Sequence, residues 1–100
     1  MKRARFIEPA RREFLAEVVY YNGKEPGLGI RFAAAVNEAT ARAVSFPLTG
    51  SPASKSTRRV FVKNFPFAVV YRPDESGIVI FAVAHHSRRP EYWQSRVQDR

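Results

Sequence analysis

The sequence of 100 residues contains no cysteine, which excludes disulfide bonds, thiol nucleophiles and cysteine-liganded zinc sites. Its two histidines, His85 and His86, are adjacent and have no acidic cluster beside them, so we expect no metal ion and no other cofactor. Apolar runs are short: residues 78–84 form the longest, far below the roughly 20 residues of a membrane-spanning helix. The basic residues 1–5 are not followed by the apolar stretch of a secretory signal. We therefore expect a cytoplasmic protein without a membrane partner.

Negative charge is also scarce, because nine Asp and Glu residues stand against 17 Lys and Arg residues and leave a net charge of +8. This charge suits a nucleic acid, an acidic protein segment or an anionic surface, and it does not choose among them. No acidic residue occurs between Pro52 and Pro73. The cations of this stretch form a candidate basic surface: Lys55, Arg58, Arg59, Lys63 and Arg72.

The first half of the chain has the apolar spacing of two helices. After Glu8-Pro9-Ala10, which is typical of a helix start, apolar residues recur at spacings of four, four and three: Ala10, Phe14, Val18 and Tyr21. Asn22-Gly23 is expected to end this helix. In the second helix, apolar residues recur at spacings of four, three, four and three: Phe32, Val36, Ala39, Ala43 and Phe46. This helix is expected to end at Pro47. The short connection predicts an antiparallel αα-hairpin that serves as scaffold.

The second half changes to the pattern of strands. Residues 4–7 are a short candidate first strand, and residues 48–57 form a polar loop in which we expect residues 51–56 to be mobile. Strands are predicted at residues 60–62, 67–71 and 78–84, with a hairpin turn at 73–77. The last strand is apolar on both faces and should be covered on both. The order β-α-α-β-β-β predicts one α+β domain over residues 1–100, with the αα-hairpin packed on a mainly antiparallel sheet.

The most unusual segment is residues 84–96, where imidazoles, guanidiniums and aromatic rings gather behind the last strand. Pro90 suits the start of a short C-terminal helix, which would display aromatic and basic side chains beside the strand end. The candidate target-binding residues are His85, Arg88, Arg89, Tyr92, Trp93 and Arg96. The alternative is a solvated terminal helix in which Trp93 only seals the core.

Alternation along residues 59–63 places Arg59, Phe61 and Lys63 on one face of a strand. Two cations on either side of an aromatic ring can bind a nucleic acid, with the phosphate backbone on the cations and a base stacked on the ring. The alternative is that the positive charges protect an edge strand from aggregation. A nucleophile elbow, a phosphate-binding glycine loop and paired carboxylates are missing. Metal-free RNA cleavage stays open, with His85 or Tyr92 as the base that activates a ribose hydroxyl.

Several segments in this order resemble the RelE/ParE superfamily of toxins from bacterial type II toxin–antitoxin systems. They are Glu8-Pro9-Ala10, Pro26-Gly27-Leu28-Gly29 before Phe32, residues 65–71 (FPFAVVY) and residues 85–93 (HHSRRPEYW). The resemblance covers residues 4–97 and implies a small basic toxin neutralised by a cognate antitoxin in a hetero-oligomer. RelE-like members cut messenger RNA on the ribosome, whereas ParE-like members inhibit DNA gyrase and replication.

Ribonuclease members carry an arginine three residues before the tyrosine of the middle strand, where this sequence has Ala68. The strand entry Phe65-Pro66-Phe67 and the ending around His85, Arg88 and Pro90 resemble the ParE side. We therefore expect a non-hydrolytic gyrase inhibitor. The alternatives are a ribosome-dependent ribonuclease and a non-toxic RNA-binding module.

The resemblance also supplies two candidate sets of residues. A ribonuclease would retain a reduced set: Arg59, Lys63, His85, Arg88 and Tyr92. For the antitoxin, an acidic, amphipathic segment is expected to use apolar anchors such as Phe6 and Val62.

Overall fold

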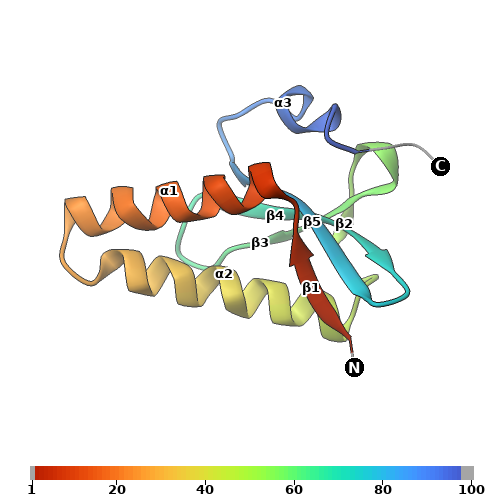
Figure 1. The fold of residues 1–100 in the computed structure, drawn as a ribbon, viewed down its shortest axis with the longest axis horizontal. Coiled ribbons are helices and arrows are strands. Elements are labelled where there is room, and N and C mark those ends of the chain that lie inside the picture. Colours follow the sequence, from red (N-terminus) through yellow and green to blue (C-terminus); the bar gives the residue numbers. More distant parts are fainter. Residues whose placement is uncertain (1, 98–100) are drawn as a thin grey trace.

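The computed structural model describes residues 2–97, which fold into one mixed sheet with helices on both faces. The elements are β1 (Arg3–Phe6), α1 (Glu8–Lys24), α2 (Leu28–Ser45), β2 (Ser51–Pro52), a 3₁₀ turn (Ser54–Ser56), β3 (Arg58–Phe61), β4 (Phe67–Asp74), β5 (Gly77–His85) and α3 (Glu91–Gln94) (Figure 1). The predicted α+β class and element order are confirmed, and β2 is an additional edge strand of two residues.

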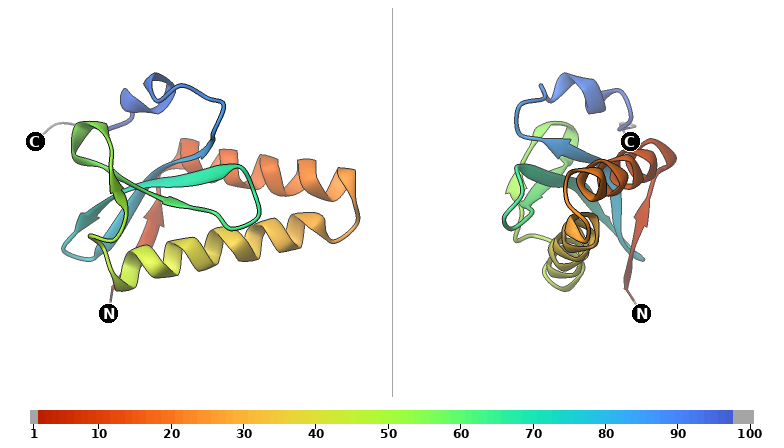
Figure 2. Two further views of the ribbon diagram at one scale, coloured as in Figure 1. Left: turned by 180° about the vertical axis from the view of Figure 1, so that it is seen from behind. Right: turned by 90° about the vertical axis from the view of Figure 1, so that its left-hand side faces the viewer.

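The strand order is β1-β5-β4-β3-β2, and only β1 is parallel to its neighbour. The mainly antiparallel sheet is thus confirmed. Figure 2 shows α1 and α2 on one side of the sheet and α3 on the other. No helix within residues 2–97 has the length and apolar character needed to cross a membrane.

The helical hairpin is tighter than its sequence pattern predicts. Helix α1 continues to Lys24, past the expected stop at Asn22-Gly23. The Asn22 side chain instead accepts a hydrogen bond from the backbone N–H of Gly29 at 2.8 Å, which satisfies a free donor at the start of α2. A Cβ on Gly29 would lie 2.3 Å from the carbonyl oxygen of Val18, so only glycine allows the helices to approach so closely.

The buried stripe of α2 is confirmed except at its last member. Phe32, Val36, Ala39 and Ala43 are fully buried, whereas Phe46 is 68% exposed. Phe46 follows the last helical residue and has a non-helical backbone (φ −134°, ψ 75°). The residue before a proline avoids helical geometry, so Pro47 turns this side chain out of the stripe.

The polar loop 48–57 carries more structure than predicted. Ser51 pairs with Arg59 in the sheet, and the Arg58 guanidinium donates to the carbonyl oxygens of Leu48 and Gly50 at 3.1 and 2.8 Å. The fully buried Tyr71 donates its hydroxyl proton to the carbonyl oxygen of Pro47 at 2.6 Å. These long-range hydrogen bonds fix both ends of the loop.

The sheet separates two apolar cores. The larger core lies under α1 and α2 and includes Phe32, Val69 and Ile80. The smaller core lies under α3 and is formed by Val70, Phe81, Ala82, Ala84, Trp93 and Val97. The prediction that the last strand is covered on both faces is therefore confirmed. The second core fixes residues 84–96, which we call the C-terminal segment, on the face opposite the long helices, where the candidate site lies.

Candidate functional site

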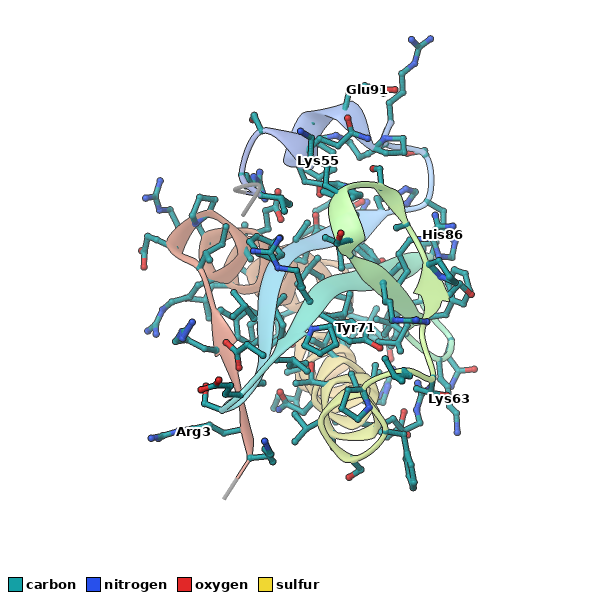
Figure 3. The ribbon with its side chains drawn as sticks, turned by 90° about the vertical axis from the view of Figure 1, so that its right-hand side faces the viewer. Arg3, Lys55, Lys63, Tyr71, His86 and Glu91 are labelled. Carbon is teal, nitrogen blue, oxygen red and sulfur yellow. The ribbon has the colours of Figure 1, made fainter. Side chains whose placement is uncertain are left out.

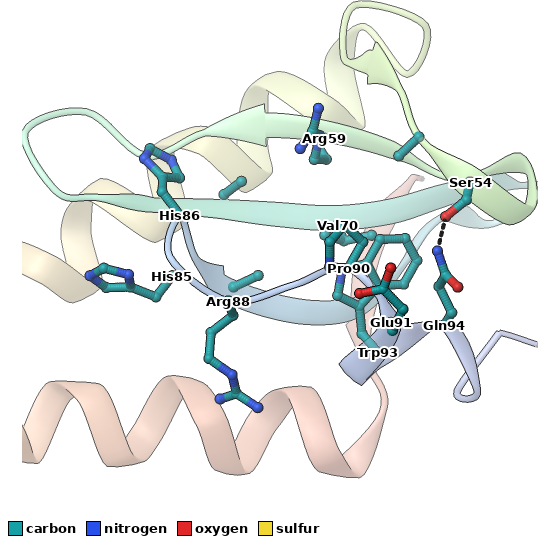
Figure 4. A pocket seen from close by; sticks show the side chains of 13 residues that line it. Ser54, Arg59, Val70, His85, His86, Arg88, Pro90, Glu91, Trp93 and Gln94 are labelled. Carbon is teal, nitrogen blue, oxygen red and sulfur yellow. Dashed lines mark hydrogen bonds between the residues drawn. The ribbon is translucent and has the colours of Figure 1, made fainter.

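A cleft of about 360 Å³ lies between the sheet and the C-terminal segment (Figure 4). Its floor consists of small side chains, because Ala68 of β4 pairs with Ala84 of β5 and Val70 follows on the same face. The walls come from the 3₁₀ turn, β3 and α3. The full lining is Ala53, Ser54, Arg59, Ala68, Val70, Ala84, His85, His86, Arg88, Pro90, Glu91, Trp93 and Gln94.

Helix α3 closes one side of the cleft and is held by packing and by one hydrogen bond. Trp93 is only 3% exposed and packs in the smaller core beside Val70. Gln94 donates a hydrogen bond to the hydroxyl oxygen of Ser54 at 2.6 Å, which joins α3 to the 3₁₀ turn. The expectation that Trp93 is displayed is therefore wrong, and its sealing of the core is the arrangement observed.

A polar clamp holds the end of the C-terminal segment against α1. Beyond the last β1 contact, no strand within residues 2–97 pairs with this edge of β5, and the Glu13 carboxylate accepts the N–H of Val83 at 3.2 Å. Its other oxygen accepts from Arg96 at 2.8 Å, and Arg96 also donates to the carbonyl oxygen of Phe81 at 3.0 Å. Arg96 therefore anchors the segment, and no local sequence pattern identifies Glu13 as its partner.

Tyr92 lies between two guanidiniums, that of Arg88 at 3.8 Å from the ring centre and that of Arg96 at 5.0 Å. Burial, with a smaller effect from the nearby Glu13 carboxylate, raises the pKa of the Tyr92 hydroxyl to about 12 against the lowering effect of the two arginines. At neutral pH this hydroxyl is protonated. It can donate a hydrogen bond, but it is poorly suited to act as a base.

The raised pKa predicts an alkaline loss of stability. The folded state holds the Tyr92 proton more tightly than the unfolded state, whose tyrosine pKa is about 10. The contribution is therefore complete below pH 10 and is lost as pH rises from 10 through about 12. Because the ring is half-buried, solvent screens part of this effect, and we expect the free energy of unfolding to fall by about 1 kcal/mol. Urea unfolding at pH 9 and pH 11.5 should show this loss in the wild type and a smaller one in Tyr92→Phe; equal losses would contradict it.

The two adjacent histidines lie on different sides of the strand end. His85 packs its ring against Phe67 with 5.1 Å between centres, and its Nδ1 accepts the N–H of Ser87 at 3.0 Å. His86 packs against Phe61 at 5.5 Å. Figure 4 shows the two imidazoles pointing apart and Arg88, which lines the cleft, extending its guanidinium toward α1.

The expected single basic surface is divided between the two faces of the sheet. Arg59 lines the cleft, whereas Arg58 faces the helices, where it binds the 48–50 carbonyls. Arg72 lies over the Phe81 ring at 5.3 Å, Lys55 is exposed in the 3₁₀ turn, and Arg89 is exposed before α3.

The expectation that Lys63 shares a strand face with Arg59 and Phe61 is wrong. Strand β3 ends at Phe61, and Lys63 lies in the following turn, where it lines a separate hollow beside α2 with Glu38. Figure 3 shows Lys63 near α2, well away from Lys55 and Glu91. The predicted alternation holds for Arg59 and Phe61, which are both exposed.

One of the two proposed antitoxin anchors is buried. Val62 is 3% exposed and belongs to the larger core, so it is not available to a partner. Phe6 is partly exposed at the sheet edge. The sequence analysis did not identify the exposed apolar side chains of the long helices, which are Leu15, Val19, Tyr20 and Ile30. The four-residue spacing of Leu15 and Val19, outside the buried stripe, is a signal that could have identified them.

Comparison with known proteins supports the resemblance seen in the sequence. The family model described as ParE toxin of type II toxin-antitoxin system, parDE, matches residues 5–90. The solved structure described as the chromosomal ParDE TA system from P. aeruginosa superposes with a TM-score of 0.72 at 17% identity, covering 85% of this chain and 96% of that chain. That likeness shows the fold. No curated protein matches the sequence. On the family match, this chain belongs to the ParE toxins of type II toxin–antitoxin systems.

Proposed function

We propose that this toxin inhibits DNA gyrase and thereby replication, and that a cognate antitoxin neutralises it by direct binding. The observation that carries the proposal is the cleft: its floor is Ala68, and the candidate ribonuclease residues Lys63 and Tyr92 lie outside it. This arrangement supports binding of a macromolecular target over cleavage of RNA.

Metal-free RNA cleavage needs a base at the ribose hydroxyl and cations at the phosphate in one place. Of the reduced ribonuclease set, Arg59, His85 and Arg88 line the cleft, whereas Lys63 and Tyr92 do not. Lys63 lies beside α2, Arg88 points toward α1, and the Tyr92 hydroxyl has a pKa of about 12. The methyl group of Ala68 cannot stabilise a charged phosphate. These four observations each weaken the ribonuclease alternative.

The C-terminal segment is the proposed gyrase contact. Arg88 and Arg89 are exposed, and Tyr92 is partly exposed, whereas Trp93 and Arg96 are turned inward and hold the segment in position. His85 packs at the strand end next to this segment. We assign target contact to the exposed members and positioning to Trp93 and Arg96.

For the antitoxin, the apolar surface of α1 and β1 is the proposed anchor region. A hollow of about 510 Å³ lies there and is lined by Ala4, Arg5, Phe6, Arg11, Phe14 and Leu15. Apolar side chains with arginines at the rim suit an acidic, amphipathic segment that folds on binding. The complex should therefore weaken only in part as salt rises, because apolar burial is not screened; complete separation by moderate salt would contradict this division.

The proposed function is tested by inducing the protein in a bacterial host while chromosome integrity and specific messenger RNAs are followed together. Broken DNA with an SOS response and intact messages is the expected result, and co-expression of the cognate antitoxin should suppress it. Truncation after Pro90 should abolish the breakage, because it removes α3.

The ribonuclease alternative is favoured by one observation, the presence of Arg59 in the cleft with the two histidines at its end. It predicts codon-positioned message cuts with intact DNA, lost in Arg59→Ala or His85→Ala. Binding to isolated RNA without any growth effect would instead indicate a non-toxic RNA-binding module.

A further inference from the structure

A further hollow lies on the α3 side of the sheet beside Arg96 and has a volume of about 530 Å³. We call it the arginine hollow; it is lined by Arg5, Ile7, Arg72, Asp74, Val79, Phe81 and Arg96. Only Arg72 and Arg96 were singled out from the sequence. The arginine hollow is separate from the cleft, because the two share no lining residue.

The sheet register builds the arginine hollow. Val79 of β5 pairs with Arg5 of β1 on one side and with Arg72 of β4 on the other. Paired residues point to the same face, so two arginines flank one apolar residue in a row across three neighbouring strands. Strands lie about 4.8 Å apart, which separates the two arginine Cα atoms by roughly 10 Å. One extended anion or one polyanion backbone can reach both guanidiniums.

The two arginines differ in how firmly they are held. Arg72 lies over the Phe81 ring at 5.3 Å, which orients its guanidinium before any ligand arrives. Arg5 lies 3.7 Å from the Asp74 carboxylate, and their side chains are 63% and 36% exposed. Such an exposed pair is weak, so a phosphate can replace the carboxylate. Arg96 is already bound to Glu13 and adds only long-range attraction.

We infer that the arginine hollow binds the phosphate backbone of duplex DNA. Guanidiniums bind phosphate oxygens with well-placed pairs of donors, and an apolar floor between them strengthens this attraction by excluding water. A single-stranded ligand needs an aromatic face on which its bases can stack. The one aromatic ring in the arginine hollow, Phe81, is only 5% exposed. A duplex stacks its bases internally and carries its phosphates along the outside of the helix, which matches this surface.

This DNA contact goes beyond the proposed function and does not depend on it, because it is measured on the purified toxin without gyrase. Fluorescence anisotropy with a labelled duplex of mixed sequence gives the affinity between 50 and 200 mM salt. Each phosphate contact contributes about −0.9 to the slope of log K against log salt, so Arg5→Gln with Arg72→Gln should flatten the slope by about 1.8. Between 50 and 200 mM salt, the double variant should therefore lose about 12-fold less affinity than the wild type loses.

The matched control removes two positive charges from the far end of the helical hairpin, as Lys24→Gln with Arg31→Gln. Both side chains are exposed, and Figure 1 shows that end of the hairpin far from β1. The slope should change by less than about 0.5 in the control. Equal flattening in control and test variants would overturn the site, because net charge alone would then explain the binding.

Two single variants keep the test valid if loss of Arg72 impairs folding. Arg5→Gln should flatten the slope by about 0.9 and leave the fold intact, since the Arg5 side chain is 63% exposed. Asp74→Asn should tighten binding, because it removes the competing charge but keeps the oxygen that accepts the Ser76 N–H at 2.9 Å. Absence of duplex binding by the wild type, or tighter binding of single-stranded DNA or duplex RNA, would overturn the assignment.

Discussion

Trp93→Ala is expected to lower the free energy of unfolding by about 3–5 kcal/mol. Trp93 is 3% exposed and is the largest side chain of the smaller core. Its removal leaves a cavity between α3 and the sheet, and a helix of four residues cannot hold its position without that packing. The loss should therefore both destabilise the protein and detach the C-terminal segment from the sheet.

The measurement is urea unfolding followed by far-ultraviolet circular dichroism, because the substitution removes the only tryptophan. Trp93→Phe keeps an apolar ring and should cost less than half as much. If Trp93 contacts the target directly, Trp93→Phe would lose activity while keeping stability. If it positions the segment, as proposed, Trp93→Phe keeps most of both. A loss below 1 kcal/mol for Trp93→Ala would contradict the smaller core as a stabilising unit.

Glu13→Ala is expected to lower the free energy of unfolding by about 2–3 kcal/mol. The Arg96 and Glu13 side chains are only 19% and 21% exposed, so the substitution leaves a partly desolvated guanidinium without its carboxylate partner. It also leaves the N–H of Val83 without its acceptor at the edge of β5. Both consequences act in the same direction, and both weaken the attachment of the C-terminal segment to α1.

The matched control is Glu8→Ala, which breaks an exposed ion pair with Arg12 one turn earlier on the same helix. Those side chains are 64% and 72% exposed, so the expected change is below about 0.5 kcal/mol. Tryptophan fluorescence reports the detachment, because Trp93 should become more accessible to a soluble quencher in Glu13→Ala only. Equal quenching in the two variants would show that the clamp does not hold the segment.

Local periodicity was sufficient to predict the fold. The spacing of Phe32, Val36, Ala39 and Ala43 marks one helix face, and the switch to alternation after residue 57 marks the strands. The failures have local reasons as well. Phe46 continues the spacing but precedes a proline, and Asn22 caps the next helix rather than ending its own.

The candidate site was harder to predict because its contacts join distant parts of the chain. Residue types alone drew attention to residues 84–96. They could not show that Arg96 pairs with Glu13, 83 positions earlier, or that Gln94 binds Ser54, 40 positions earlier. The predicted position of Lys63 was wrong for a different reason. The strand ends two residues before Lys63, and alternation cannot be extended past a strand end. The arginine hollow depends on the register of three strands, which no local pattern contains.

The most direct test of gyrase inhibition uses the purified toxin, gyrase and supercoiled plasmid, with a programmed ribosome assay run in parallel. The expected result is linear DNA that accumulates only when gyrase and toxin are both present, while the ribosome-bound message stays intact. A cut message with unaffected gyrase would contradict the proposal and would mean that a cleft with Ala68 on its floor still cleaves RNA.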